Sequence, residues 1–216
     1  MSAAEDHRAR VALTMLAEPG NRTVWTMVEA AGAPNTLDRL LRGDIPESRL
    51  RTAVIARLAA GDPRRRAEVA LRRGERQGAR IIVPGDAEWP AGVGSLATLE
   101  LDVGGTVNQD IRPPLCLWVR GGCRVDDAFQ RSVAIVGARA ATSYGTQVTT
   151  DIAFGLAERD WTVVSGGAFG IDAAAHRAAL AAGGVTVADL DGRDRPDGAD
   201  VNEAAQLRMG EAHERG

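Results

Sequence analysis

Residues 133–145 read Val-Ala-Ile-Val-Gly-Ala-Arg-Ala-Ala-Thr-Ser-Tyr-Gly, and this stretch decides the fold. Its first four residues form a continuous apolar run that stops at Gly137, as is typical of a buried parallel strand. Residues 146–159 follow as a predicted helix, and residues 161–164 form a second apolar strand. The face of this helix that we expect to be buried carries Val148, Ile152, Leu156 and Ala157. The order of strand, helix and strand predicts a β-α-β unit.

A second helix and a third strand extend this unit. Residues 172–182 are rich in alanine and end at two glycines, and residues 185–188 form another apolar run. Three strands with two crossovers make half of a doubly wound sheet, in which both strand-end loops lie at the same edge. We therefore predict an α/β protein with a partial (extended) Rossmann-like parallel sheet, and we expect the functional site at that edge.

The chain upstream of the sheet is predicted to be helical. Apolar residues recur at helical spacing in residues 7–16, 23–31, 36–41 and 49–60, with Gly, Pro and Asn between these stretches. An arginine-rich helix at 63–77 and short strands at 81–83 and 115–120 follow. The predicted organisation is a helical domain of the helix-hairpin-helix type at 1–78, a connecting segment at 79–125, the Rossmann-like core at 126–190 and a loosely ordered acidic tail at 191–216.

The composition excludes several kinds of chemistry. The 26 basic residues are all arginine, and P-loops, Schiff bases and cofactor aldimines each require a lysine. The formal net charge is −3, so DNA binding would need a local basic patch. Arginines gather between residues 39 and 80, which permits such a patch, although arginines also solvate ordinary exposed helix faces. Both interpretations stay open at this point.

The cysteines and the hydropathy bound the setting of the protein. Cys116 and Cys123 have no histidine nearby, so we predict two structural thiols and no metal site or disulfide framework. The sequence has no apolar run of membrane-spanning length, and residues 1–10 are charged. We expect a cytoplasmic protein with no membrane partner.

The first strand-end loop has the parts of a phosphate-binding site. Arg139 lies just after Gly137, and free N–H groups are expected at the start of the next helix. The hydroxyl-rich start of that helix contains Ser143, Tyr144 and Gly145. The loop lacks the three spaced glycines of the dinucleotide fingerprint, so we expect no NAD or FAD and no other cofactor. The alternative interpretation is that Arg139 pairs with Asp172.

The second strand-end loop, residues 165–172, is rich in glycine. It contains Ser165, Gly166, Gly167 and Gly170. Such a loop can present a nest of amide donors, or it can form a tight strand-to-helix turn capped by Asp172. His176 lies four residues after Asp172, so we expect these two side chains to touch and the imidazole to be structural rather than catalytic.

Taken together, these stretches resemble the DprA/Smf family of DNA-processing proteins in order and spacing. The matching segments are residues 133–139, 143–145, 165–172, 175–177, 179–180 and 183–184. The resemblance implies a protein without catalytic activity that binds single-stranded DNA in a positively charged pocket. It also implies that family members dimerise and help to load RecA recombinase onto incoming strands during natural transformation.

The resemblance also implies which residues form the pocket. Arg139 corresponds to the family arginine that contacts DNA phosphate, and Arg177 to a basic position after the histidine. The predicted DNA-binding residues are Gly137, Arg139, Ser143, Tyr144, Gly145, Ser165, Gly166, Gly167, Gly170 and Arg177, with Asp172 and His176 supporting the pocket.

The sequence departs from the family pattern after residue 188. The second half of the family's sheet, with the part associated with dimerisation, does not follow, so we expect a truncated protein. Two alternatives remain open. One is a Rossmann-type nucleotide-binding or phosphoribohydrolase-like enzyme, although its proline-glycine-glycine loop with a nearby glutamate is missing. The other is a degenerate fragment with no activity, which a DNA titration would distinguish from a binder.

Overall fold

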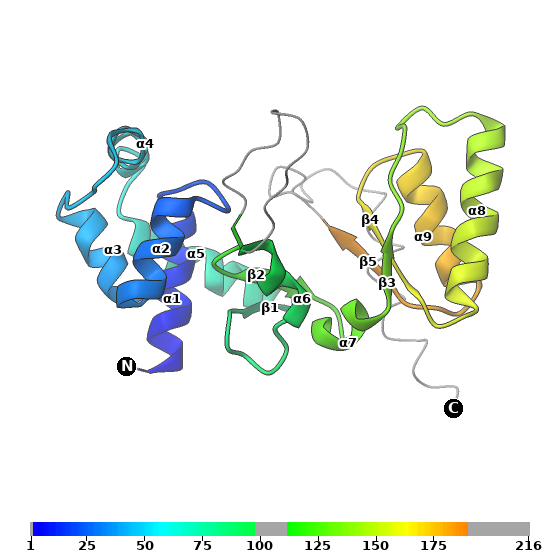
Figure 1. Cartoon of the computed structure of the whole chain (residues 1–216), viewed down its shortest axis with the longest axis horizontal. Helices are drawn as coiled ribbons and strands as arrows, with labels where there is room; N and C mark the ends of the chain where they lie inside the picture. The colour runs from blue at the N-terminus through cyan, green and yellow to red at the C-terminus, as the bar shows by residue number, and fades with distance from the viewer. Residues whose placement is uncertain (1, 98–111, 190–216) are drawn as a thin grey trace. The chain divides into compact units, whose positions relative to one another are not determined.

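The chain forms two compact units, Met1–Arg120 and Gly121–Gly216, in a computed structural model that describes residues 2–97 and 112–189 (Figure 1). The elements of the first unit are α1 (Ala3–Thr14), α2 (Arg22–Ala31), α3 (Ala33–Leu41), α4 (Ser48–Leu58), α5 (Pro63–Arg76), β1 (Ala79–Ile82), α6 (Ala91–Gly94), the 3₁₀ turn η1 (Ser95–Ala97) and β2 (Leu117–Arg120). Those of the second unit are α7 (Val125–Gln130), β3 (Ser132–Ala134), α8 (Ser143–Ala157), β4 (Thr162–Gly166), α9 (Ile171–Ala181) and β5 (Thr186–Asp189). The tail predicted at 191–216 lies outside the described residues.

The helices of the first unit begin at capping residues and bury their apolar faces against one another. Ser2 caps α1 and Asn21 caps α2, each by accepting a backbone N–H of the first turn. Asp62 caps α5, whose first residue is Pro63. The fully buried side chains at the centre of this core include Val11, Leu13, Leu16, Val24, Leu40 and Val54. The predicted helical N-terminal part is therefore confirmed.

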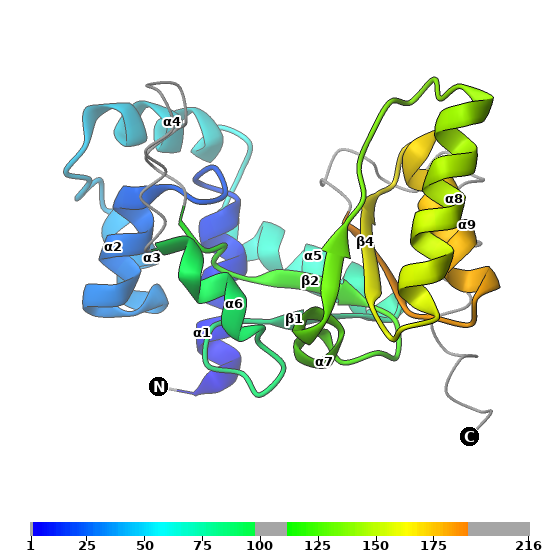
Figure 2. The same cartoon turned by 45° about the vertical axis from the view of Figure 1, so that its right-hand side comes forward.

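A short strand pair packs on α5 of this unit. Strands β1 and β2 are antiparallel, with Ile81 opposite Trp118 (Figure 2). The Trp118 ring lies against Gly74 of α5, where an added Cβ would come within 2.5 Å of a ring carbon. Glycine at this position lets the indole ring reach the helix backbone. The connecting segment predicted at 79–125 is thus divided between the two units.

Cys116 belongs to the core of the first unit, whereas Cys123 of the second unit is half-buried. Burial raises the pKa of the Cys116 thiol to about 11, so this group stays protonated and unreactive at about pH 8. We expect a disulfide reagent to titrate Cys123 in the native protein, and Cys116 only after denaturation. The Cys123→Ser variant, which should show no accessible thiol, is the control. Two thiols that react at the same rate in the native protein would contradict the burial of Cys116.

The second unit contains the predicted parallel sheet. Strand order is β3-β4-β5, with Val133 beside Val163 and Val163 beside Thr186. Helices α8 and α9, the two crossovers, lie on the same face of the sheet (Figures 1 and 2). Strand β3 ends at Ala134, earlier than expected, although the Ile135 N–H still donates to the Val164 carbonyl at 2.9 Å. The predicted α/β fold class is confirmed.

Small residues form the contact between α8 and α9. The buried residues of α8 are Thr149, Ala153 and Ala157, while α9 contributes Ala175, Ala178 and Ala179 to the same core. The predicted buried face of α8 is correct at Ala157, half-buried at Val148 and Leu156, and wrong at Ile152, which is 52 % exposed. Close packing of two helices favours small side chains at the contact, so the larger apolar residues of α8 lie to the side. Hydropathy alone pointed to the larger residues.

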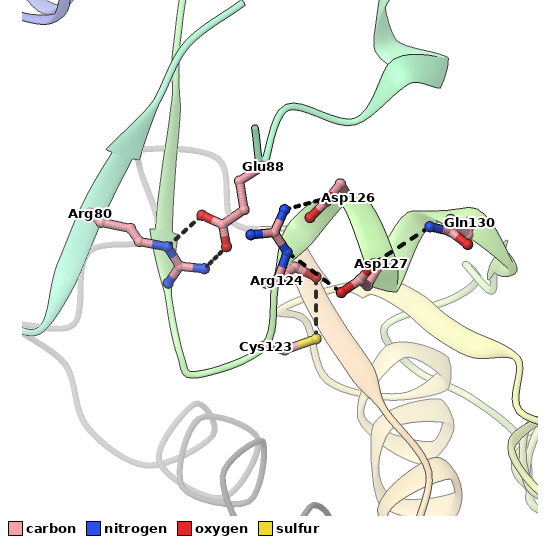
Figure 3. Close-up of polar contacts among 7 residues, drawn as sticks. All are labelled: Arg80, Glu88, Cys123, Arg124, Asp126, Asp127 and Gln130. Carbon is pink, nitrogen blue, oxygen red and sulfur yellow. Dashed lines mark hydrogen bonds and ion pairs between the residues drawn. The ribbon is translucent and has the colours of Figure 1, made fainter. Parts of the chain in front are cut away.

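A group of ion pairs marks the start of α7. Arg124 contacts Asp126 at 2.7 Å and Asp127 at 3.6 Å, and Gln130 donates to Asp127 (Figure 3). The hydrogen bond from Arg124 lowers the pKa of the Asp126 carboxyl.

Across residues 2–97 and 112–189, no helix is long and apolar enough to cross a membrane.

Candidate nucleic-acid interface

The two strand-end loops of the parallel sheet meet backbone to backbone. The Ile171 N–H donates to the Ala138 carbonyl at 3.2 Å. Gly170 has a φ of 81°, and a Cβ there would lie 2.3 Å from the Ala138 oxygen and 2.4 Å from the Arg139 oxygen. Only glycine combines this left-handed conformation with such a close approach. Gly170 therefore holds the loop after β4 directly against the loop after β3.

Gly137 also lies where the two loops meet, but it does not form the tight turn that the sequence predicted. Its φ is not in the left-handed region, but a Cβ would come within 2.6 Å of Ile171 Cγ1. A Cβ on Gly145 would also reach Ile171, at an ordinary 3.6 Å from Cδ1. The loop after β3 thus folds over the first residue of α9, and Gly137 is needed for contact rather than for turning.

The start of α8 leaves backbone donors at the loop. Thr142 caps this helix, and its hydroxyl accepts the Gly145 N–H at 3.1 Å. The N–H groups of Ser143 and Tyr144, in the first turn, have no intrahelical acceptor. The Tyr144 side chain is 79 % exposed. Free N–H groups at a helix start are an arrangement that suits an anion, and anion binding at this position stays a prediction.

Arg139 lies between these features and is exposed. Among the residues that the structure describes, its guanidinium makes no hydrogen bond or ion pair, and the alternative pairing with Asp172 does not occur. The sequence analysis did not include two exposed apolar residues of the strand-end loops among the site residues. They are Phe169 in the second loop (67 % exposed) and Val136 at the start of the first (74 % exposed). An aromatic residue inside a glycine-rich loop was the available signal for Phe169.

Ser165 and His176 hold the sheet together beneath the loops. The Ser165 hydroxyl, 2 % exposed, donates to the Ile135 carbonyl at 2.6 Å and so joins β4 to the end of β3. His176 Nε2 bonds the Gly166 carbonyl at 2.9 Å, and Nδ1 bonds the Thr186 hydroxyl at 2.7 Å. The expected Asp172–His176 contact is wrong, because β4 and β5 already use both ring nitrogens. The imidazole thus links β4 to β5, and its partners differ from the predicted one.

Asp172 is a buried carboxylate in the first turn of α9. It is the second residue of the helix, and the capping position is Gly170, so the predicted cap at Asp172 is wrong. Its side chain is held over Gly166, where a Cβ would lie 2.6 Å from Oδ2. A carboxylate near a helix N-terminus interacts favourably with the helix dipole. Asp172 thereby stabilises the start of α9 without capping it.

The remaining predicted residues lie at different distances from this junction. Gly167 belongs to the second loop and is half-buried. Arg177 is exposed and lies six residues after Ile171, about 9 Å along the helix axis. Within the described part of the chain, Arg177 makes no polar contact with either loop. The same residues contain no group of three or more His, Cys, Asp or Glu side chains that could hold a metal ion. The structure brings the two loops together but leaves Arg177 apart.

The three parallel strands, the two crossover helices on one face and the joined glycine loops define a Rossmann-like protein whose loops lack the dinucleotide fingerprint. Comparison with known proteins gives its particular class. Residues 80–202 match the model of the family described as DNA recombination-mediator protein A. The chain belongs to this family, and the resemblance stated from the sequence is confirmed.

Two curated relatives are named as DNA processing proteins of the DprA type. A DNA-processing protein DprA of Mycobacterium tuberculosis is 42 % identical over 188 residues, which cover 86 % of this chain and 46 % of the relative. The DNA processing protein DprA of Bacillus subtilis is 35 % identical over 80 residues, or 37 % of this chain and 27 % of the relative. This chain spans about half the length of the Mycobacterium relative.

A solved structure supports the fold. The DNA processing protein A of Streptococcus pneumoniae superimposes with a TM-score of 0.57 at 23 % identity, covering 88 % of this chain and 58 % of that chain. This similarity extends over both the helical part and the parallel sheet, so the order of the elements is that of a known family fold.

Proposed function

We propose that this chain binds single-stranded DNA at the carboxyl ends of β3 and β4, as a DNA-processing protein rather than an enzyme. The observation that carries the proposal is Arg139, an exposed arginine without a protein partner among the described residues, beside the free N–H groups that start α8. Guanidinium and helix N–H groups are both suited to phosphate oxygens. The family description, a DNA recombination mediator, supports DNA as the source of that phosphate.

The exposed aromatic residues of the two loops support a single strand over a duplex. Tyr144 and Phe169 are 79 % and 67 % exposed, and unpaired bases stack on such side chains without sequence preference. In a duplex the base faces are already stacked. The phosphate contact of Arg139 would add affinity that falls as salt rises.

The finer role follows from the family. Since its members are described as recombination mediators, we propose that the bound strand is passed to a recombinase of the RecA type during natural transformation. Dimerisation, which the resemblance implies for full-length members, would bring two such sites together. We also propose that the domains of this protein divide at residues 78, 125 and 190, as the sequence predicts.

The test is fluorescence anisotropy of a labelled oligothymidylate with the wild-type chain and the Arg139→Ala variant over a salt series. Removing one phosphate contact should weaken binding about 10-fold at low salt and reduce the log–log salt slope by about 0.7.

Arg159→Ala is the matched control. It removes the same charge from the same unit, but Arg159 bonds the Gly155 carbonyl at the end of α8, away from the loops. This variant should bind within about 2-fold of wild type. Equal losses in the two variants, or no binding by a folded wild-type chain, would overturn the proposed function.

A further inference from the structure

Helix α5 of the first unit carries a row of arginines on its outer face. Arg65, Arg72 and Arg76 are seven and four residues apart, a spacing that places them on one side of a helix. The buried residues of α5 are Pro63, Ala67 and Gly74, on the other side. We call Arg65, Arg72 and Arg76 the arginine stripe; it is about 16 Å long.

Most arginines of the first unit already serve the fold. Arg10 contacts Asp6 and the Leu115 carbonyl, Arg51 donates to the Ile45 carbonyl, and Arg80 binds Glu88 at 2.6 and 2.8 Å (Figure 3). Arg57 pairs with Glu18, and Arg112 lies over the Trp25 ring. These contacts explain why such side chains are arginine.

The stripe has no comparable explanation. Arg65 and Arg76 are exposed and make no hydrogen bond or ion pair within the described residues. Arg72 has only a 3.9 Å contact with Glu68, and its side chain is 66 % exposed. Val69, between the first two arginines, is 52 % exposed. The stripe therefore offers three guanidinium groups in a line to the solvent.

Arg65 is also placed against the helix dipole. It is the third residue of α5, and apart from the capping Asp62 the start of this helix contains no acidic residue. A cation at that end is unfavourable. Its neighbours Arg64 and Arg66 are compensated, one by Asp38 and the other by the Arg57 carbonyl at 3.5 Å, whereas Arg65 is not. Helix stability therefore does not account for Arg65.

We propose that the arginine stripe is a second DNA-contacting surface, which binds successive phosphates of a strand by charge. A line of guanidinium groups can contact several phosphates of one strand, because guanidinium binds phosphate oxygens well. Among the described residues of α5, Val69 is the one large apolar side chain that is exposed beside the stripe, which is too little for insertion into a membrane. This surface lies outside the strand-end loops, and the proposal does not depend on the site at Arg139.

The experiment compares the full chain with a variant in which Arg65, Arg72 and Arg76 are all changed to glutamine. Binding of labelled oligothymidylate is followed by anisotropy over a salt series. We expect about 10-fold weaker binding at low salt and a salt slope reduced by about 2, since three charges are removed. The variant should unfold at about the same urea concentration, because losing Arg65 relieves an unfavourable interaction with the helix dipole while losing Arg76 in the last turn removes a favourable one.

The matched control changes Arg8, Arg22 and Arg49 to glutamine. These exposed residues lie on α1, α2 and α4, so the control removes the same charge without removing a row. It should bind within about 2-fold of wild type. Equal loss in both triple variants would mean a net-charge effect and would overturn the proposal, as would unchanged binding by the stripe variant.

Two further outcomes separate this proposal from its competitors. Loss of DNA binding in Arg139→Ala but not in the stripe variant would overturn the proposed role of the stripe and leave the proposed function standing. Loss of DNA binding in the stripe variant but not in Arg139→Ala would overturn the proposed site at Arg139 and support the stripe. Cosedimentation with phosphatidylserine vesicles that is lost in the stripe variant, while DNA binding is unchanged, would assign the stripe to membranes and overturn it as a DNA surface.

Discussion

Replacing Gly170 by alanine is expected to destabilise the second unit by about 3 kcal/mol and to abolish DNA binding at the strand ends. The left-handed conformation at a φ of 81° costs an alanine about 1–2 kcal/mol. The new methyl group would also overlap the Ala138 and Arg139 carbonyl oxygens, which are backbone atoms that cannot rotate away. Overpacking of this kind adds about 1–3 kcal/mol. Urea unfolding followed by circular dichroism measures the loss.

Gly183→Ala separates conformational strain from overlap. Gly183 has a φ of 76°, but a Cβ there would meet nothing within 4 Å. This variant should lose only about 1 kcal/mol and keep its DNA affinity. Equal stability of the Gly170→Ala and Gly183→Ala variants would contradict the close contact between the two loops.

His176→Leu should destabilise the second unit by about 2–4 kcal/mol, through lost hydrogen bonds rather than lost volume. The imidazole is 6 % exposed and joins the Gly166 carbonyl at the end of β4 to the Thr186 hydroxyl of β5. Leucine has a similar size but leaves the Gly166 carbonyl without this donor in a buried place. The same urea experiment measures the change.

The neighbouring Arg177→Leu variant is the control for this second prediction. Arg177 is exposed on the same helix, so its replacement should change stability by less than about 0.5 kcal/mol. Wild-type stability in His176→Leu would mean that the two hydrogen bonds contribute little, and would contradict the structural role of the imidazole.

The sequence was sufficient to predict the order of strands and helices from β3 to β5, although it did not reveal α7. The first two apolar runs stop at or next to glycines, and the crossover helices show apolar residues at helical spacing or a high alanine content. The same patterns predicted the meeting of the two loops, because parallel strands end at one edge. The prediction failed at the buried face of α8, where Ala153 rather than Ile152 faces α9. Such a choice depends on how closely two helices approach, which a single sequence does not specify.

The sequence predicted that the two strand-end loops lie together, but not which contacts their side chains make. Arg139 and the glycines stand out by residue type, but the roles of Asp172 and His176 depended on which neighbour each side chain reaches. The four-residue spacing suggested that these two would contact each other. The carbonyl of Gly166 and the hydroxyl of Thr186, brought in by the sheet, are better partners for the imidazole. Contacts made by tertiary neighbours are not visible in local spacing.

The hydrogen bonds of His176 also bear on how the protein folds. Gly166 and Thr186 are each ten residues from His176 along the chain, so β4, α9 and β5 close through two short loops. Short loops lose little chain entropy on closing. By contrast, the Ser165 hydroxyl reaches the end of β3 across 30 residues. We therefore expect the β4–α9–β5 segment to form early, so that the loop after β4 is already ordered when the loop carrying Arg139 docks on it.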